Sequence, residues 1–221
     1  MNLSQSAEQR GKADVGIFWD YENVHIPARC SSPLKACAAI VKKAEKYGKI
    51  QQRRVYSDYS RDDSNVAWWS ADISGSGFDL VSTPRRGATK SKETLDRKMI
   101  QDIIFFAWDV VDRGGSPCVV LITSDGDFAF TINKLRDRGA TNVVIHGSNA
   151  SKVLVDSADI AFNLEKDVLP QALLQRTACS QDRLDGADDF FDNSGIHQVL
   201  DASVQVATHQ TLCRDRDKKP C

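Results

Sequence analysis

The chain has 221 residues, of which 41% are hydrophobic and 27% are charged, enough for one ordinary domain with a buried core and a tail. The formal net charge of -1 excludes a polycation that binds nucleic acid along its whole length, so any such affinity needs a local basic patch. The N-terminus is polar and the longest apolar runs are too short to cross a bilayer, so we expect a cytoplasmic protein with no signal peptide and no membrane span.

The six cysteines include no C-x-x-C pair, and three of them lie in the polar C-terminal part of the chain. We therefore expect free thiols in a reducing compartment rather than disulfides. A zinc site at His197, His209 and Cys213 is a weak alternative, because their spacing matches no structural zinc pattern.

Residues 1–14 are polar and are expected to form a flexible leader. Short apolar runs rich in β-branched and aromatic residues then predict strands, and apolar residues that recur every three or four positions predict helices. In chain order the expected elements are a strand at 15–19, a helix at 32–47, a strand at 51–56, a helix at 65–74, a strand at 78–82, a helix at 92–113, a strand at 118–123, a helix at 127–138, a strand at 142–147, a helix at 151–158 and a strand at 160–164.

Strands that alternate with helices imply βαβ crossovers and a parallel sheet. We therefore expect an α/β fold of three layers, in which helices cover both faces of a mostly parallel central sheet. The domain is expected to span residues 15–169. Beyond it the pattern fades, so residues 170–221 are expected to be a polar, mostly disordered tail, which leaves open a homodimer or a protein partner bound through it.

Three aspartates stand where such a sheet binds ligands, outside the carboxyl ends of its strands. Asp20 directly follows the first expected strand, and Asp125 follows the most apolar one. Asp96 lies in the first turns of the long helix, which begins at the same edge of the sheet. We therefore expect these three side chains, which are distant in sequence, to converge.

Clustered carboxylates repel one another unless a cation neutralises them, and hard oxygen ligands select Mg²⁺ or Mn²⁺ over zinc. A bound divalent ion can activate water and neutralise charge on a phosphodiester, which is the basis for predicting a nuclease. Each acid also has a purely structural explanation. Asp20 could hold a turn, and Asp125 could cap the next helix. Asp96 could be an acid that the helix dipole stabilises in the first turns of its helix.

Three stretches carry a resemblance to a known family. FWDYENVHIP at residues 18–27, TLDRKMIQDI at 94–103 and LITSDGDF at 121–128 resemble, in family order, the motifs of NYN domains of the limkain type, a branch of the PIN-like nuclease superfamily. The resemblance covers about residues 15–169. In one departure, Ser124 directly precedes Asp125, where the family usually has a glycine between them.

The resemblance implies a PIN-like fold and an Mg²⁺- or Mn²⁺-dependent ribonuclease, acting as an endonuclease on single-stranded RNA in RNA regulation. It leaves a peroxisomal association and the nucleus open beside the cytoplasm. By the match, the metal ligands would be Asp20, Asp96 and Asp125, all catalytic, with Asp127 as a further catalytic acid. The supporting residues would be Asn23, which orients the first loop, Thr123, Ser124 and Asp102, although Asp102 points about 240° round the helix from Asp96.

Basic residues gather around the start of the long helix, where a phosphate backbone needs positive charge beside an acidic metal centre. The candidates for RNA binding are Arg85, Arg86, Lys90, Lys92, Arg97 and Lys98. A solvated loop and helix face is the alternative explanation. Tyr59, Trp68 and Trp69 are candidates for stacking on unpaired bases, although aromatic residues on a helix more often pack into the core.

Other functions fit the sequence less well. A catalytically weak RNA-binding or scaffold module on the same fold is the main alternative to the enzyme. A phosphatase of the haloacid dehalogenase type needs D-x-D-x-T after a strand, and Ala129 replaces the threonine here. A dinucleotide site is disfavoured because Gly75 and Gly77 precede a strand instead of following one.

Overall fold

The computed structural model describes residues 12–58, 64–82 and 92–174, with the backbone alone at helix residues 64–68 and 92–93. The described residues belong to one compact unit. Six strands form one parallel sheet in the order β3–β2–β1–β4–β5–β6. The strands are β1 (Ala13–Asp20), β2 (Gly48–Ser57), β3 (Asp79–Ser82), β4 (Pro117–Ile122), β5 (Thr141–His146) and β6 (Ile160–Asn163).

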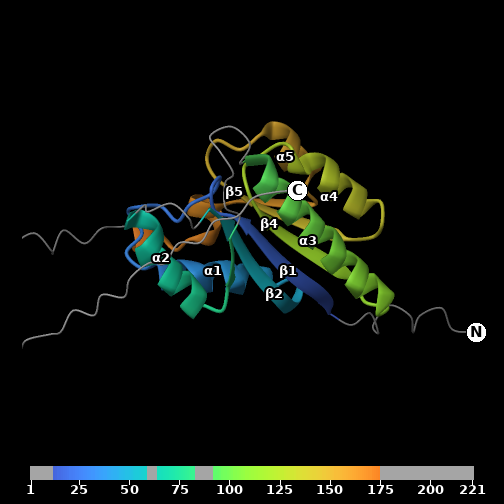
Figure 1. Ribbon diagram of the computed structural model, residues 1–221, viewed down its shortest axis with the longest axis horizontal. Helices are drawn as coiled ribbons and strands as arrows, with labels where there is room; N and C mark the ends of the chain where they lie inside the picture. Colours follow the sequence, from blue (N-terminus) through green and yellow to red (C-terminus); the bar gives the residue numbers. More distant parts are fainter. Residues whose placement is uncertain (1–11, 59–63, 83–91, 175–221) are drawn as a thin grey trace, which may run out of the picture. The chain divides into compact units, whose positions relative to one another are not determined.

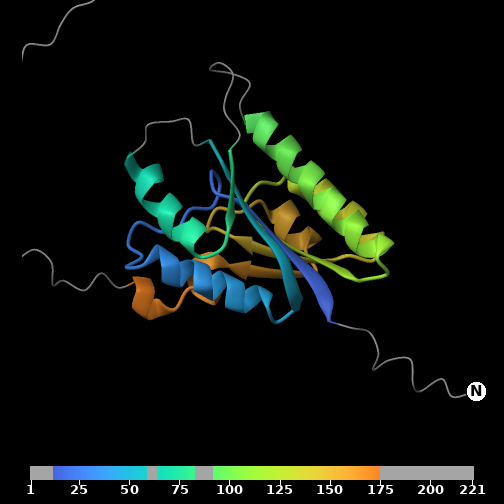
Figure 2. The ribbon, with the colours of Figure 1, turned by 60° about the horizontal axis from the view of Figure 1, so that its bottom comes forward.

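Helices cover both faces of this sheet (Figures 1 and 2). They are α1 (Pro33–Ala44), α2 (Ser64–Gly75), α3 (Lys92–Asp112), α4 (Phe128–Arg136), α5 (Lys152–Ser157), the π-helix η1 (Leu164–Val168) and α6 (Gln171–Leu174). Figure 1 shows α1 and α2 on one side of the strands and α3 and α4 on the other. The predicted three-layer α/β fold is confirmed, and all six described strands run parallel.

Two hydrophobic cores lie on the two faces of the sheet because successive side chains of a strand point in opposite directions. In β1, Ile17 and Trp19 pack into the core under α1 and α2, whereas Phe18 between them packs into the core under α3 and α4. Strand β4 is buried along its whole length, as expected for a central parallel strand. Both cores therefore hold the ends of β1 and β4 firmly in place.

Gly16 lets α3 approach β1 closely. A Cβ atom at this position would lie 2.7 Å from the ring of Phe18 and 2.9 Å from the ring of Phe106. Those two rings instead meet edge to face, with their centroids 5.7 Å apart. A side chain at residue 16 would push α3 away from the strand whose end carries Asp20.

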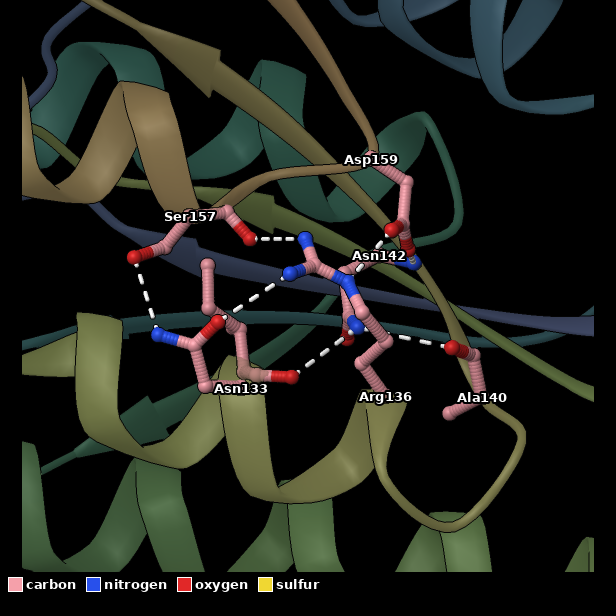
Figure 3. Close-up of polar contacts among 7 residues, drawn as sticks. Asn133, Arg136, Ala140, Asn142, Ser157 and Asp159 are labelled. Atoms are coloured by element: carbon pink, nitrogen blue, oxygen red, sulfur yellow. Dashed lines mark hydrogen bonds and ion pairs between the residues drawn. The ribbon is translucent and has the colours of Figure 1, made fainter.

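A network of polar contacts joins α4 to the α5–β6 turn and to β5 (Figure 3). The Arg136 guanidinium donates to Asp159 Oδ1 at 2.6 Å and also to Asn133 Oδ1 and the Ser157 carbonyl oxygen. Asp159 Oδ2 accepts a hydrogen bond of 2.7 Å from the backbone N–H of Asn142. One arginine and one aspartate thus fix the relative positions of three elements.

The sequence predictions miss two short helices near the end of the described chain. Residues 164–168 form a π-helix capped by Asn163, whose side chain accepts from two backbone N–H groups at 3.1 Å. Helix α6 follows and buries Leu173, so ordered structure continues past residue 170, where the tail was predicted to begin. The rest of the predicted tail, from residue 175, lies outside the described residues, as does the candidate zinc site in it.

Two further predictions concern bilayers and thiols. Across the described ranges, none of the helices has the length and apolar content needed to cross a bilayer. Cys30, Cys37 and Cys118 are free thiols and all three are buried. The other three cysteines lie beyond the described residues.

Candidate active site

The strand order reverses direction between β1 and β4, because the chain adds β2 and β3 on one side of β1 and then β4 on the other. In open α/β sheets such a switch point is where ligands bind, at the carboxyl ends of the strands. Asp20 ends β1 and Thr123 follows β4, and the preceding residues Trp19 and Ile122 are partners in the sheet. The two polar residues therefore stand level with each other at the switch point.

Asp20 is fully buried there and is surrounded by hydrogen-bond donors. Its Oδ2 atom accepts from the Thr123 hydroxyl at 3.0 Å and from the Asn23 side-chain amide. Its Oδ1 atom accepts from the Asn23 backbone N–H at 3.3 Å. The backbone N–H of Val24 donates to the Asp20 carbonyl oxygen at 3.0 Å, so Asp20 also holds the turn that follows β1.

Burial raises the pKa of Asp20 above its usual value of 3.8, even though the hydrogen bonds from Asn23 and Thr123 favour the charged form. Glu22 raises this pKa further through charge repulsion. The fold therefore disfavours the ionised carboxylate, and a cation near this point would relieve the cost.

Thr123 connects Asp20 to the loop that carries Asp125. Its hydroxyl donates to Asp20 and accepts from the backbone N–H of Asp125 at 3.2 Å. The Asp125 side chain is half-buried, and its Oδ1 atom accepts from the Asp127 backbone N–H at 3.1 Å. Asp125 therefore also stabilises the turn before α4, while Asp127 is exposed and makes no side-chain cap of that helix.

Ser124 fastens the same loop to the segment after β5. The Ser124 hydroxyl accepts from the Gly147 backbone N–H at 3.0 Å, and the Ser124 carbonyl accepts from the Ser151 N–H at 3.1 Å. Gly126 passes so close that an added Cβ would lie 2.7 Å from the Ser151 hydroxyl oxygen. The supporting roles predicted for Ser124 and Thr123 thus have a physical counterpart, because both fix the backbone beside Asp125.

Asp96 lies on the first turns of α3 and is half-buried, with its Oδ1 atom shielded from solvent. The adjacent Leu95 and Met99 pack into the same core as Phe18 and Leu121, near the ends of β1 and β4. This packing holds the start of α3 on the face of the sheet beneath the carboxyl ends of β1 and β4. We refer to these strand ends, which carry Asp20 and Asp125, as the acidic edge. It does not by itself bring Asp96 to Asp20.

Asp102 is held by other partners, away from Asp20. It pairs with Arg54 Nη1 at 3.1 Å and with Lys98 Nζ at 3.3 Å, and it accepts from the Tyr56 hydroxyl at 2.9 Å. It joins α3 to β2, which agrees with its expected rotation round the helix from Asp96. These contacts give Asp102 a structural role. Its predicted role as a supporting residue of the site stays a prediction.

The sequence analysis missed three residues at this edge. Asp58 follows β2 and is buried, and its backbone N–H donates to Glu22 Oε1 at 3.1 Å. The signal that identified Asp20 and Asp125, an acid directly after a strand, also applies to Asp58. The ring of His25 meets Tyr21 edge to face with centroids 5.0 Å apart. Partial burial of this ring lowers the pKa of His25, and the nearby carboxylates of Asp20 and Glu22 oppose that shift.

The predicted RNA-binding residues are only partly described. Arg85, Arg86 and Lys90 lie outside the described residues, as does the side chain of Lys92. Arg97 is exposed on α3, and Lys98 pairs with Asp102 on the next turn. Arg97 and Lys98 are thus the members of the set whose side chains are described, and both are exposed on α3.

Trp69 packs into the core, which was the more common outcome expected for an aromatic residue on a helix. Trp69 is 5% exposed and stacks on Tyr21 with ring centroids 3.8 Å apart, so its face is already covered inside the core. The ring closes the core beneath the turn that follows β1, and no base can reach it. Tyr59 and the side chain of Trp68 lie outside the described residues.

The acidic edge suits a hard divalent cation in the type of its donors, since carboxylate oxygens are the ligands Mg²⁺ and Mn²⁺ prefer. Within residues 12–58, 64–82 and 92–174, however, no three His, Cys, Asp or Glu side chains are grouped closely enough to hold a metal ion. The gathering of Asp20, Asp96 and Asp125 around one ion therefore stays a prediction. Mg²⁺ commonly uses one or two carboxylates and completes its coordination with water and phosphate.

Comparison with known proteins decides the family. The NYN domain family matches residues 14–165, which include all of β1 but its first residue, the whole of β4 and all the acids described above. This chain belongs to the NYN domain family. The six-stranded parallel sheet with helices on both faces agrees with the PIN-like fold of NYN domains, and the predicted family is confirmed.

The NYN domain is similar to part of three much longer vertebrate proteins, each named meiosis regulator and mRNA stability factor 1. Identity is 28% over 173 residues with the Gallus gallus protein, 26% over 187 residues with that of Xenopus tropicalis and 27% over 172 residues with that of Bos taurus. These alignments cover 75%, 80% and 75% of this chain but only 9%, 10% and 9% of the relatives, so the chain spans about a tenth of their length.

A solved structure supports the fold alone. The crystal structure of a protein of unknown function from Vibrio parahaemolyticus matches with a TM-score of 0.57 and 21% identity, over 72% of this chain and 97% of the other. The NYN domain thus has a nuclease-type fold, and its relatives are named for messenger RNA stability.

Proposed function

We propose that the chain is a metal-dependent ribonuclease that cuts single-stranded RNA internally and acts in RNA regulation in the cytoplasm. Asp20, Asp96 and Asp125 would hold Mg²⁺ or Mn²⁺, and Asp127 would assist. The observation that carries this proposal is the Thr123 hydroxyl, which links the buried carboxylate of Asp20 to the backbone of Asp125 at the switch point of the sheet.

The cost of an ionised, buried Asp20 supports the metal. Burial raises its pKa, so the charged form carries a cost that an adjacent cation would offset. A bound divalent ion would supply an activated water molecule and neutralise charge that develops on the phosphodiester. Thr123 and Asn23 would keep the Asp20 carboxylate in one orientation for that ion.

The names of the similar vertebrate proteins support RNA as the substrate, and the exposed Arg97 supports a nearby phosphate contact. Arg97 lies one residue after Asp96 on the same turn of α3. A strand of RNA that places a phosphate at the acidic edge would therefore pass this guanidinium.

A second candidate is an RNA-binding module of the same fold that does not cleave. One observation favours it, namely that within the described ranges no cluster of three acids is assembled. In that case Asp20 would serve to hold the turn after β1, and Asp125 would serve as the acceptor in the turn before α4. The two candidates differ in whether RNA that binds is cut.

The test compares cleavage of an end-labelled single-stranded RNA, in Mn²⁺, by the full chain and by two variants. We expect internal cuts by the wild-type chain and a loss of at least about 100-fold in rate for Asp20→Asn and for Asp125→Asn, because each removes a ligand worth several kcal/mol. Asp137→Asn is the matched control, since this exposed acid pairs with Lys134 and should leave the rate unchanged.

Single-stranded DNA of the same sequence, tested in parallel, establishes the substrate class, and the proposal expects little cutting of it. Circular dichroism confirms that each variant is folded. Wild-type rates from either Asp20→Asn or Asp125→Asn would show that the acidic edge is not the catalytic centre.

A further inference from the structure

A polar cleft lies between α3 and β2, on the face of the sheet that α3 covers. Its volume of about 370 Å³ is that of a small-molecule site. β3 pairs with residues 54–57 of β2, and among the described residues no strand lies beside the earlier part of β2 on that side. The lining of this α3–β2 cleft combines amides, charged groups and an aromatic ring, among them Gln51, Gln52, Arg54, Phe105, Asp109 and Arg113.

An irregularity in β2 brings two neighbouring amides to the cleft. Successive side chains of a regular strand point to opposite faces, so Gln51 and Gln52 would not both line it. In the pairing with β1, however, Val15 pairs with Ile50 and Gly16 pairs with Gln52, which leaves Gln51 as an extra residue in β2. Such a bulge changes the direction of side chains and is frequent beside functional sites.

The two amides offer hydrogen bonds of both kinds. The Gln52 Nε2 atom is shielded from solvent and has no hydrogen-bond partner among the described residues. A buried donor without a partner costs free energy, and rotation of this amide would let it donate to a ligand in the cleft. Gln51 Nε2 already donates to Asp14 Oδ1 at 2.5 Å, so its Oε1 atom is the one that can accept from a ligand.

The rest of the lining suits a flat, uncharged ligand. Phe105 is 49% exposed, so part of its ring is open to a planar group. The charged groups of the lining are two arginines and two aspartates, so their formal charges cancel. Arg54 pairs with Asp102 at 3.1 Å, and Arg113 and Asp109 complete the set. A phosphate needs an excess of positive charge, which this cleft does not have.

We propose that the α3–β2 cleft holds an unpaired base of an RNA strand, stacked on Phe105 and hydrogen-bonded at its edge to Gln51 and Gln52. An unpaired base is flat and uncharged and carries donors and acceptors, and proteins recognise it by aromatic stacking and edge contacts. The choice of RNA rests on the proposed function. Phe105 lies nine positions after Asp96, about 14 Å along α3, so this base would lie away from the phosphate that is cut.

The test measures binding of a short, labelled single-stranded RNA to the full chain by fluorescence anisotropy, in EDTA so that no RNA is cut. We expect Phe105→Ala to raise the dissociation constant about fivefold or more, because a stacking surface is lost. Phe130→Ala is the matched control, since this ring is 72% exposed on α4 and does not line the cleft. With an RNA of the same length that lacks its bases, Phe105→Ala should bind as the wild-type chain does.

Gln52→Leu separates a binding role from a structural one. It replaces a buried donor that has no partner by an apolar side chain of similar size, so the unfolding free energy should not fall. The affinity for RNA should nevertheless fall about threefold or more. Gln101→Leu is the control, because Gln101 is exposed on α3 outside the cleft lining, and it should leave the affinity unchanged.

Free adenosine offers the chemistry of a base without the strand. It should displace the RNA only at concentrations about 100-fold or more above those at which the RNA itself binds, because a strand adds contacts outside the cleft. Displacement at equal concentrations would identify a free nucleoside as the ligand and overturn the choice of RNA.

Three other results would overturn the proposal: RNA affinity that Phe105→Ala leaves unchanged, an equal loss of affinity for the RNA without bases, or a Gln52→Leu chain that loses stability and affinity together. The fate of the nuclease is read separately. Cleavage in Mn²⁺ by a wild-type chain whose RNA affinity does not depend on Phe105 would overturn the cleft alone, whereas base-dependent binding without cleavage would overturn the nuclease alone.

Discussion

Asp20 combines two properties that oppose each other in a purely structural residue. It is fully buried, which raises the pKa of its carboxyl group, and both its oxygens accept hydrogen bonds, which favour its charged form. An asparagine would fill the same space without an ionisation cost, but its amide nitrogen could not accept the hydrogen bonds that one of these oxygens receives. Burial and hydrogen bonding therefore act in opposite directions on the carboxyl group of Asp20.

Replacement of Asp20 by Asn should change how stability depends on pH. The pKa of Asp20 is about 3.8 in the unfolded chain and higher in the folded chain. At pH values between these two pKa values the folded state binds more protons than the unfolded state. The unfolding free energy of the wild-type chain therefore falls as pH rises through this window. The variant does not titrate there. The difference in unfolding free energy, Asp20→Asn minus wild type, should therefore increase from acid to neutral pH.

Urea unfolding at a series of pH values measures this difference. The altered hydrogen bonds of an asparagine add the same amount to this difference at every pH, so only its change with pH reports on the carboxyl group. A difference that stays flat, or that shrinks as pH rises, would show that the buried carboxyl group is not held at a cost.

Thr123 should matter through its hydroxyl alone. Thr123→Val keeps the shape of the side chain but removes the donor to Asp20 and the acceptor for the Asp125 N–H, so we expect a loss of about 1–3 kcal/mol in unfolding free energy. Cleavage should also fall, because Asp20 loses its fixed orientation. Thr123→Ser restores the hydroxyl and should recover cleavage more fully than stability, whereas equal behaviour of Val and Ser would exclude this role.

At the scale of elements, the sequence predicted the order and type of the strands and main helices because their apolar patterns are strong. The buried run of β4 and the helical spacing of α3 are examples. The π-helix η1 was not predictable, since it depends on the Asn163 cap and on contacts with distant residues such as Arg29, which pairs with Glu165. The choice between base stacking and core packing stayed open for Trp69, because a helix sequence does not show which aromatic ring will stack on Tyr21.

The network around Arg136 offers a prediction at this scale. Asp159→Ala removes the acceptor of both the Arg136 guanidinium and the Asn142 backbone N–H, which should cost about 1–3 kcal/mol in unfolding free energy. Asp137→Ala breaks only an exposed pair with Lys134 and should cost less than about 0.5 kcal/mol. Urea unfolding compares the two, and equal losses would show that the network does not hold α4 and β6 together.

For the candidate site, the sequence identified the acids but not their arrangement. Asp20 and Asp125 were recognisable because each stands near the end of an apolar strand, and the same signal at Asp58 was overlooked. Thr123 was a candidate through the family resemblance alone. The rotation of Asp102 away from Asp96 followed from helix geometry. Its pairing with Arg54 did not, because that contact joins α3 to β2 across 48 residues of sequence.

At the scale of the whole molecule, the NYN domain brings the ends of β1 and β4 together and supports them with two cores, while α3 and β2 line a polar cleft. The vertebrate relatives are about ten times longer, and this chain matches about a tenth of each of them.

The most direct test of the account is a metal-switch experiment on bound RNA. The full chain is freed of metal with EDTA and mixed with a labelled single-stranded RNA, and the bound and cut fractions are followed as Mn²⁺ is added. We predict that RNA binds uncut without the ion, is cut internally as Mn²⁺ rises, and is cut no further once EDTA is restored. RNA that stays bound and intact at every Mn²⁺ concentration would contradict the nuclease and leave a binding module.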